Sequence, residues 1–208
     1  MEQATILEDT APPKLVWVKP LHQISIVGTM GSGKTTLARY LYSRYRWGRA
    51  KRGVVSVYFQ FEREKIDVFW ETLESLDAYY AYIVIDDISF SLSRGDREFL
   101  HRLAKIRHAN PSVKRWVVVT IMHYSRATLP FIRQSHSKIL TSLADPEEIE
   151  QLRWSFKLES LWDYYDVYRT MPTSHWALFN WLGNIFITRF PRPRRRCWDI
   201  VVSGPECV

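Results

Sequence analysis

The chain has 208 residues and a mass of 24.7 kDa, which fits one domain with a small appendage. Hydrophobic residues make up 46% and charged residues 25%, and these values exclude a disordered or low-complexity chain. The 29 Lys and Arg exceed the 22 Asp and Glu, and the net charge of +7 favours a polyanionic partner. The two cysteines, Cys197 and Cys207, exclude a disulfide framework and a Cys/His zinc site, but leave one disulfide open.

No segment has the pattern of a targeting signal or of a membrane span. Residues 1–10 carry three acids and lack the apolar region of a signal peptide. Residues 170–188 are the longest stretch without Lys, Arg, Asp or Glu, but polar residues recur throughout it. Because a spanning helix needs about 20 mainly apolar residues, we predict two short strands in this stretch instead.

Short apolar runs alternate with helical patterns through most of the chain. We expect an N-terminal extension over 1–20 with a short strand at 15–18, one domain over 21–190, and a basic, loosely held tail over 191–208. This alternation predicts an α/β fold, a mainly parallel sheet flanked by helices. Strands are predicted at 24–27, 54–61, 82–85, 116–121 and 139–143, helices at 34–46, 64–76, 96–108 and 146–156, and a C-terminal hairpin on the sheet edge at 176–190.

Residues 28–35 match the phosphate-binding motif G-x-x-x-x-G-K-[ST] in every required position. The motif follows a predicted strand and opens a predicted helix. Its glycines let backbone N–H groups point at phosphate oxygens, and the helix N-terminus favours negative charge. Lys34 is expected to reach the β- and γ-phosphates and Thr35 to bind Mg²⁺. The predicted nucleotide-binding residues are Gly28, Thr29, Met30, Gly31, Ser32, Gly33, Lys34, Thr35 and Thr36.

Two acids, Asp86 and Asp87, end the apolar strand at 82–85. The metal of a bound nucleotide needs a carboxylate near the hydroxyl of the phosphate-binding loop. We therefore predict that Asp86 and Thr35 hold Mg²⁺ and that Asp87 orients or polarises the attacking water. The alternative is that the two acids merely end a buried strand in solvent.

A polar turn follows the predicted strand at 116–121. Ligands of parallel α/β sheets bind beyond the carboxyl ends of the strands. Thr120 and His123 are therefore candidates to sense the γ-phosphate. A single histidine after a strand is as often structural, and both interpretations of His123 stay open.

With these elements in order, the sequence resembles the FtsK–HerA superfamily of DNA-pumping ATPases. It is most similar to the genome-packaging ATPases of tailless icosahedral viruses, including those of archaea. The resemblance covers about residues 22–193. It rests on the loop 28–35, the acidic strand end 82–87, the segment 104–108, the strand and turn 116–125 with Leu129-Pro130, the segments 137–140 and 145–148, and the hairpin 176–190.

The sequence departs from the family pattern at two site positions. Asp87 stands where the family usually has Glu, and the shorter acid would position a water differently. His123 stands where the family usually has Gln. An imidazole can bond a phosphate or a water, but its charge depends on pH.

The resemblance implies a RecA/FtsK-like P-loop NTPase that uses ATP and Mg²⁺ to package double-stranded DNA into a preformed capsid. It also implies a homo-oligomeric ring, a pentamer or hexamer, in the host cytoplasm or at the packaging vertex, with capsid or membrane-vertex proteins as further partners. A neighbour's arginine would complete each site. Arg107 matches that position best, with Arg94, Arg97 and Arg126 as rivals, although a solvated helix end explains Arg107 equally well.

Four basic segments suit contacts with the DNA backbone. They are 44–52, where aromatic residues are interleaved, 63–65, 89–97 and 192–196. A solvated turn explains any one residue of the first somewhat better, and the last would also suit another virion protein or a membrane surface.

Two other functions fit the same motifs. A small P-loop nucleoside or nucleotide kinase would need a mobile lid, for which residues 89–97 are the only candidate. A nucleotide-gated DNA-binding or virion-assembly protein would bind nucleotide without significant turnover.

Overall fold

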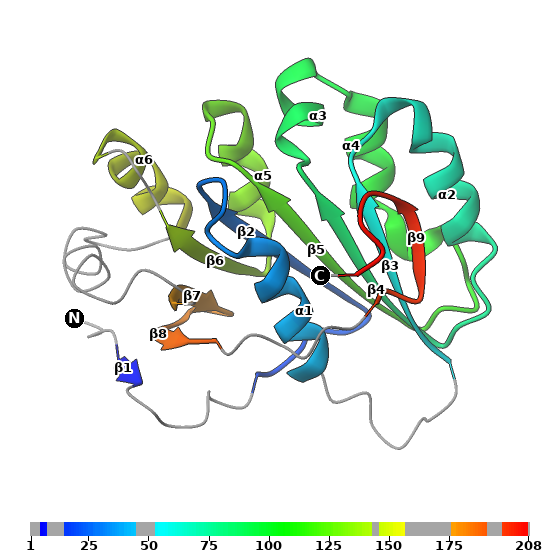
Figure 1. Ribbon diagram of the computed structural model, residues 1–208, viewed down its shortest axis with the longest axis horizontal. Helices are drawn as coiled ribbons and strands as arrows, with labels where there is room; N and C mark the ends of the chain where they lie inside the picture. The colour runs from blue at the N-terminus through cyan, green and yellow to red at the C-terminus, as the bar shows by residue number, and fades with distance from the viewer. Residues whose placement is uncertain are drawn as a thin grey trace.

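A single mainly parallel sheet runs through the computed structural model, which describes residues 5–7, 15–44, 53–142, 146–156, 176–190 and 197–207. Its strands are β1 (Thr5–Leu7), β2 (Leu21–Gly28), β3 (Val54–Gln60), β4 (Tyr80–Asp86), β5 (Arg115–Met122), β6 (Ser137–Ser142), β7 (Trp176–Trp181), β8 (Asn184–Arg189) and β9 (Ile200–Ser203). Their order is β1-β8-β7-β6-β2-β5-β4-β3-β9, and among these strands β7 alone runs antiparallel to its neighbours (Figure 1).

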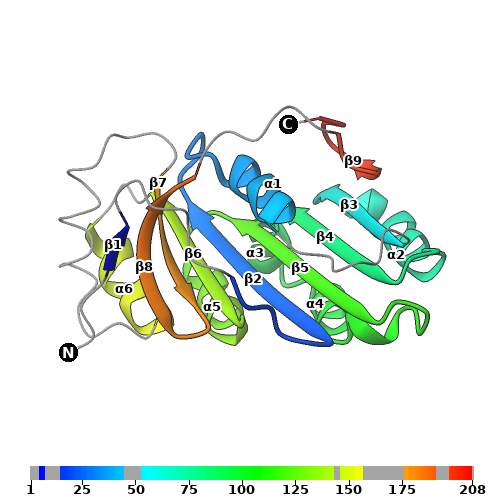
Figure 2. The ribbon, with the colours of Figure 1, turned by 90° about the horizontal axis from the view of Figure 1, so that it is seen from below.

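Helices cover the two faces of the sheet unequally (Figure 2). The α-helices are α1 (Lys34–Arg44), α2 (Ile66–Glu74), α3 (Ser89–Arg94), α4 (Arg97–Ala104), α5 (Leu129–Gln134) and α6 (Pro146–Phe156), with short 3-10 helices η1 (Arg63–Lys65), η2 (Ile106–His108) and η3 (Arg126–Thr128). One core cluster joins α2, α4, α5 and α6 to one face, and the other joins α1 to the opposite face. The central strands are buried on both faces, which is why β4 and β5 read as nearly continuous apolar runs.

The predicted fold class is confirmed, and all the predicted strands and helices except the strand at 15–18 appear with shifted ends. The hairpin of β7 and β8 is present, but β1 pairs with β8 and lies outside it. The predicted helix 96–108 is divided into α4 and η2. Residues 89–97, the lid candidate of the kinase alternative, form α3 and the start of α4.

The short strand predicted at 15–18 is wrong. These residues have no sheet partner because side chains take their backbone groups. The Val18 amide donates to Nδ1 of His22, and Trp181 Nε1 donates to the Val16 carbonyl. Trp17 packs edge-on against Trp181, so the apolar run covers the sheet instead of joining it.

The expectation of a loosely held tail is wrong for residues 197–207. β9 pairs in parallel with β3 at one edge of the sheet, and Cys197 and Cys207 form a disulfide. The tail arginines of 192–196 and the basic cluster of 45–52 lie outside the described residues. No helix in the described part of the chain is long and apolar enough to cross a membrane.

Candidate nucleotide-binding site

The phosphate-binding loop lies at the carboxyl edge of the parallel strands. β2 ends at Gly28, and α1 begins at Lys34. β2 lies between β6 and β5, and β4 follows β5, so their carboxyl ends surround the loop. This is where parallel α/β sheets bind ligands.

Glycines give this loop its shape. Gly31 and Gly33 have φ angles of 75° and 84°, in the left-handed region that favours glycine. Gly28 is needed for space, because a Cβ there would lie 2.1 Å from the Thr141 hydroxyl oxygen. Met30 is 86% exposed at the loop tip, and Thr36 is partly buried in the first turn of α1.

Lys34 is folded back onto the loop that carries it. Its Nζ donates to the carbonyl oxygens of Gly28, at 2.9 Å, and Thr29, at 2.6 Å. The side chain is only 8% exposed. Burial lowers the pKa of Lys34, while Asp86 and Asp87 act in the opposite direction. The ammonium group thus lies in a partly desolvated place where an anionic ligand would stabilise it.

The Asp86 carboxylate is held by three donors. Its Oδ2 accepts from the Thr35 hydroxyl at 2.8 Å and from the Tyr58 hydroxyl at 2.8 Å, and its Oδ1 accepts from the Asp87 amide at 2.9 Å. The Tyr58 pKa is raised, chiefly by burial and then by the charge of Asp86, so this phenol keeps its proton and acts as a donor. The carboxylate is therefore fixed beside the hydroxyl predicted to share its metal.

Thr35 and Asp86 offer the oxygen ligands that Mg²⁺ prefers. Mg²⁺ takes one or two protein oxygens and fills its shell with water and substrate phosphates. A hydroxyl and a carboxylate oxygen 2.8 Å apart fit that requirement. In the described part of the chain, no group of three or more His, Cys, Asp and Glu residues is placed to hold a metal.

Asp87 has an unusual backbone conformation. Its φ is 59°, in the left-handed region, where a residue other than glycine is uncommon and strained. The following amide, of Ile88, donates to the Ile121 carbonyl of β5 and holds this turn. Such strain is often found at functional sites, and it aims Asp87 differently from a residue that simply continues the strand.

Ser89 joins two predicted site residues. Its hydroxyl donates to Asp87 Oδ1 at 3.4 Å and accepts from the His123 amide at 3.1 Å. The structure thus brings the turn after β5 next to the acidic end of β4. His123 itself is partly buried, and Thr120 is buried within β5, where its hydroxyl donates to the Ile24 carbonyl. Thr120 therefore lies inside the sheet and not at its carboxyl edge.

Arg107 lies away from these groups within the same chain. It belongs to η2, which precedes β5, whereas the loop is at the carboxyl ends of the strands. Arg107 is exposed, and its Nε donates to His108 Nε2. Arg126, in η3, lies directly after β5 and is exposed. Arg97 is exposed at the start of α4, and the Arg94 side chain lies outside the described residues.

Several polar residues outside the predicted set also touch the site. Ser142 bonds the Thr29 hydroxyl at 2.5 Å and Thr141 bonds the Ser32 hydroxyl at 2.6 Å, so the end of β6 holds the loop. Both lie at the carboxyl end of a predicted strand, so the rule applied to Asp86 could have found them. Tyr58 had no such signal.

Solved structures with the same architecture include viral packaging enzymes. The genome-packaging NTPase B204 from Sulfolobus turreted icosahedral virus 2, in complex with AMPPCP, matches with a TM-score of 0.54 at 14% identity, over 85% of this chain and 100% of that one. Its complex with AMP gives a TM-score of 0.52 at 14% identity over the same shares. The chain has the mainly parallel α/β fold of this viral genome-packaging NTPase.

A secretion ATPase has the same fold. The cytoplasmic domain of the type VII secretion ATPase EccC from Thermomonospora curvata matches with a TM-score of 0.56 at 13% identity, over 90% of this chain and 28% of that one. No model of a known protein family matches the sequence, and no curated protein does. The likeness is thus one of fold, and function has to be argued from the site.

Proposed function

We propose that this chain is an ATP-driven translocase that packages double-stranded viral DNA into a preformed capsid. The observation that carries the proposal is the fixed contact between Thr35, beside the lysine of the phosphate-binding loop, and Asp86 at the end of β4. This pairing is what hydrolysis of a Mg-nucleotide requires. The fold match with a viral genome-packaging NTPase, over all of that protein, supports the choice of cargo.

The side chains of the site divide the work of hydrolysis. Lys34 exchanges its two loop carbonyls for phosphate oxygens and stabilises the charge that develops there. Thr35 and Asp86 hold Mg²⁺, which when bound neutralises charge on the β- and γ-phosphates. Asp87, turned by its left-handed backbone and bonded by Ser89, orients the attacking water, and His123 senses the γ-phosphate from the next strand.

The remaining parts of the proposal concern assembly. A homo-oligomeric ring, a pentamer or hexamer, would let an arginine of one subunit reach the site of the next. Arg107 suits this role because it is exposed and lies at the opposite edge of the sheet from its own loop. Double-stranded DNA is the expected partner, the host cytoplasm or the packaging vertex the expected location, and capsid or membrane-vertex proteins further partners.

The kinase alternative loses its structural basis at residues 89–97. A phosphoacceptor kinase needs a mobile lid, and this segment is the helix α3 and the start of α4. Ser91 is fully buried in it, and Leu92 packs against the main core. A segment held in this way does not open over a substrate without losing core contacts.

The test is the rate of ATP hydrolysis with and without double-stranded DNA over a series of protein concentrations. We expect a rate that rises with DNA and with concentration, because assembly completes the sites. Lys34→Ala should lower it by about 10²–10³-fold, the usual cost of removing one charge-stabilising donor. Lys114→Ala, an exposed lysine just before β5 and outside the four basic segments, is the matched control and should hydrolyse at the wild-type rate.

Two results would contradict the proposal. Transfer of the phosphate to a nucleoside, with no effect of DNA, would favour the kinase. Nucleotide binding without turnover in every condition would favour the gated-binding protein.

A further inference from the structure

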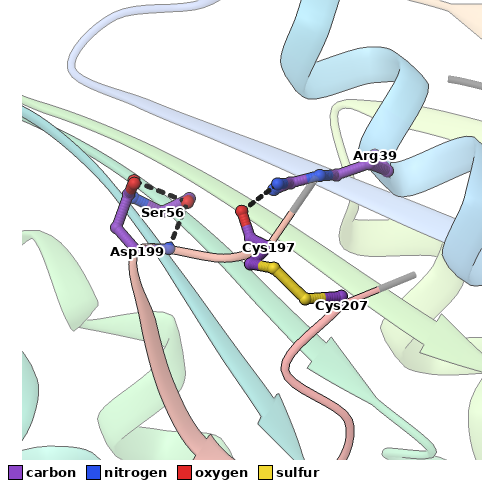
Figure 3. The surroundings of a disulfide bond; sticks show 5 residues. All are labelled: Arg39, Ser56, Cys197, Asp199 and Cys207. Carbon is purple, nitrogen blue, oxygen red and sulfur yellow. Dashed lines mark hydrogen bonds between the residues drawn. A yellow bond between two sulfur atoms is a disulfide. The ribbon is translucent and has the colours of Figure 1, made fainter. Parts of the chain in front are cut away.

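A short loop closed by the chain's one disulfide lies next to the candidate site. Residues 197–207 carry β9, and the bond between Cys197 and Cys207 closes them into a ring (Figure 3). The loop is fastened to β3 by side chains. Asp199 accepts from both the amide and the hydroxyl of Ser56, each at 2.7 Å, and the Ser203 hydroxyl donates to the Gln60 carbonyl.

The same loop is fastened to α1, the helix that follows the phosphate-binding loop. Arg39, which is 3% exposed, donates from its guanidinium to the Cys197 carbonyl, as Figure 3 shows. The Arg39 guanidinium carbon also lies 4.1 Å from the centre of the Trp198 ring, a cation–π distance. Trp198 is 5% exposed and is thus enclosed between the loop and the domain.

Trp198 reaches the site through one further residue. Its ring stacks on Tyr58 of β3 with centroids 5.4 Å apart and planes 11° from parallel. Tyr58 is paired with Val84 on the neighbouring strand, so Asp86, two residues further on, is on the same face. The Tyr58 hydroxyl reaches that carboxylate at 2.8 Å.

We propose that Tyr58 is a positioning residue for the metal-binding carboxylate of Asp86, and that the disulfide-closed loop 197–207 holds Tyr58 in place through Trp198. The inference rests on the proposed function, because it assigns a support to the same site. Groups that orient a metal-binding carboxylate typically change metal affinity or activity by about 10–100-fold when removed. The loop is more than a covering of the sheet edge, because its tryptophan contacts the residue that fixes Asp86.

The test compares Tyr58→Phe with Tyr40→Phe. Tyr58→Phe keeps the ring that stacks on Trp198 and removes only the hydroxyl that bonds Asp86. Tyr40→Phe removes the hydroxyl of a buried tyrosine of α1, whose ring packs near Phe190 instead. The dissociation constant of a fluorescent ATP analogue is measured in EDTA and over a Mg²⁺ series, together with hydrolysis and the melting temperature.

For Tyr58→Phe we expect nucleotide affinity in EDTA within about twofold of wild type, and a Mg²⁺ midpoint raised by about 10-fold. Tyr40→Phe should leave the Mg²⁺ midpoint unchanged. A Tyr58→Phe protein that melts lower but keeps the wild-type Mg²⁺ midpoint would show a purely structural tyrosine and overturn the assignment.

The part played by the loop is tested in the wild-type protein. The disulfide is accessible, since Cys197 is exposed. A phosphine reductant, which converts the disulfide to two thiols and is itself oxidised, should raise the Mg²⁺ midpoint in the same direction, as should Trp198→Leu. An unchanged midpoint in both would overturn the role of the loop. Wild-type protein that binds no nucleotide at all would instead overturn the proposed function, and this inference with it.

Discussion

The two ends of the central strands both carry polar residues, but these residues are arranged for different purposes. At the amino end, His22 is fully buried, and both of its ring nitrogens have fixed partners. Nδ1 accepts from the Val18 amide at 2.9 Å, and Nε2 lies 2.9 Å from the Ser137 hydroxyl. Trp17 and Trp181 pack against the ring. This end is a closed polar cluster whose groups satisfy one another.

At the carboxyl end the polar groups share partners or hold strained positions. One oxygen of Asp86 accepts two hydroxyls, Lys34 bonds carbonyls of its own loop, and Asp87 has a left-handed backbone. These arrangements can be exchanged for contacts with a ligand. Buried polar groups occur at both ends of the strands, so burial alone does not distinguish a structural polar cluster from a binding site. The distinguishing feature is whether the groups can exchange their partners for a ligand.

The largest expected effect is a loss of ATP hydrolysis when the site at the carboxyl ends of the strands is altered and the fold is kept. Asp86→Asn should lower ATP hydrolysis by at least about 10²-fold, since it removes a charge from the proposed metal site. The melting temperature should fall only modestly, because the amide oxygen can still accept from Thr35 and Tyr58 and only the bond from the Asp87 amide to Oδ1 is lost. Steady-state hydrolysis and thermal unfolding measured on the same preparation check this. A large loss of stability with unchanged hydrolysis per folded molecule would show that Asp86, like His22, has a structural role.

The next effect belongs to the amino end and depends on pH. Burial, with His136 and Arg115 nearby, lowers the pKa of His22 to about 3, against 6.5 in an unfolded chain. Below pH 6.5, His22 is therefore protonated in the unfolded chain, whereas in the folded protein it stays neutral. The stability from this group is complete above pH 6.5 and is lost progressively towards pH 3. At pH 4.5 the loss should be about 3 kcal/mol.

The measurement is the free energy of unfolding in urea at pH 7 and pH 4.5, for wild type and for His22→Gln. Glutamine does not titrate. The difference in free energy of unfolding between wild type and His22→Gln should therefore change by about 3 kcal/mol from pH 7 to pH 4.5. Parallel pH profiles would show that His22 does not carry this dependence.

The smallest of these effects concerns the disulfide that closes the loop 197–207 beside the carboxyl end of the strands. Replacing both Cys197 and Cys207 by serine should lower the free energy of unfolding by about 2–3 kcal/mol, because a short closed loop gains entropy in the unfolded chain. Urea unfolding with and without reductant checks this value. Reductant should affect wild type and leave the double variant unchanged, and an equal response in both would assign the loss to another cause.

The phosphate-binding loop could be predicted because its chemistry is contained in consecutive residues. Asp86 followed from a general rule that places the ends of parallel strands at one edge. Tyr58 could not be predicted in this way. Its contact depends on the pairing of β3 with β4 and on the face that Tyr58 shares with Asp86. Both are set by contacts distant in the sequence.

The two ends of the chain were the least predictable parts. Residues 15–18 have the apolar pattern of a strand, but His22 and Trp181 take backbone groups there. Residues 197–207 follow a run of arginines and prolines that suggested a loose tail. Their order comes from a partner strand about 140 residues earlier and from one pair of cysteines.

The two outermost strands of the sheet, β1 with three residues and β9 with four, are its shortest among those described. A long, flat outer strand offers unpaired N–H and C=O groups that recruit further chains and lead to aggregation. Both borders of this sheet end in strands too short to serve as such templates. Copies of this chain that meet side by side would therefore not do so by joining their sheets into one.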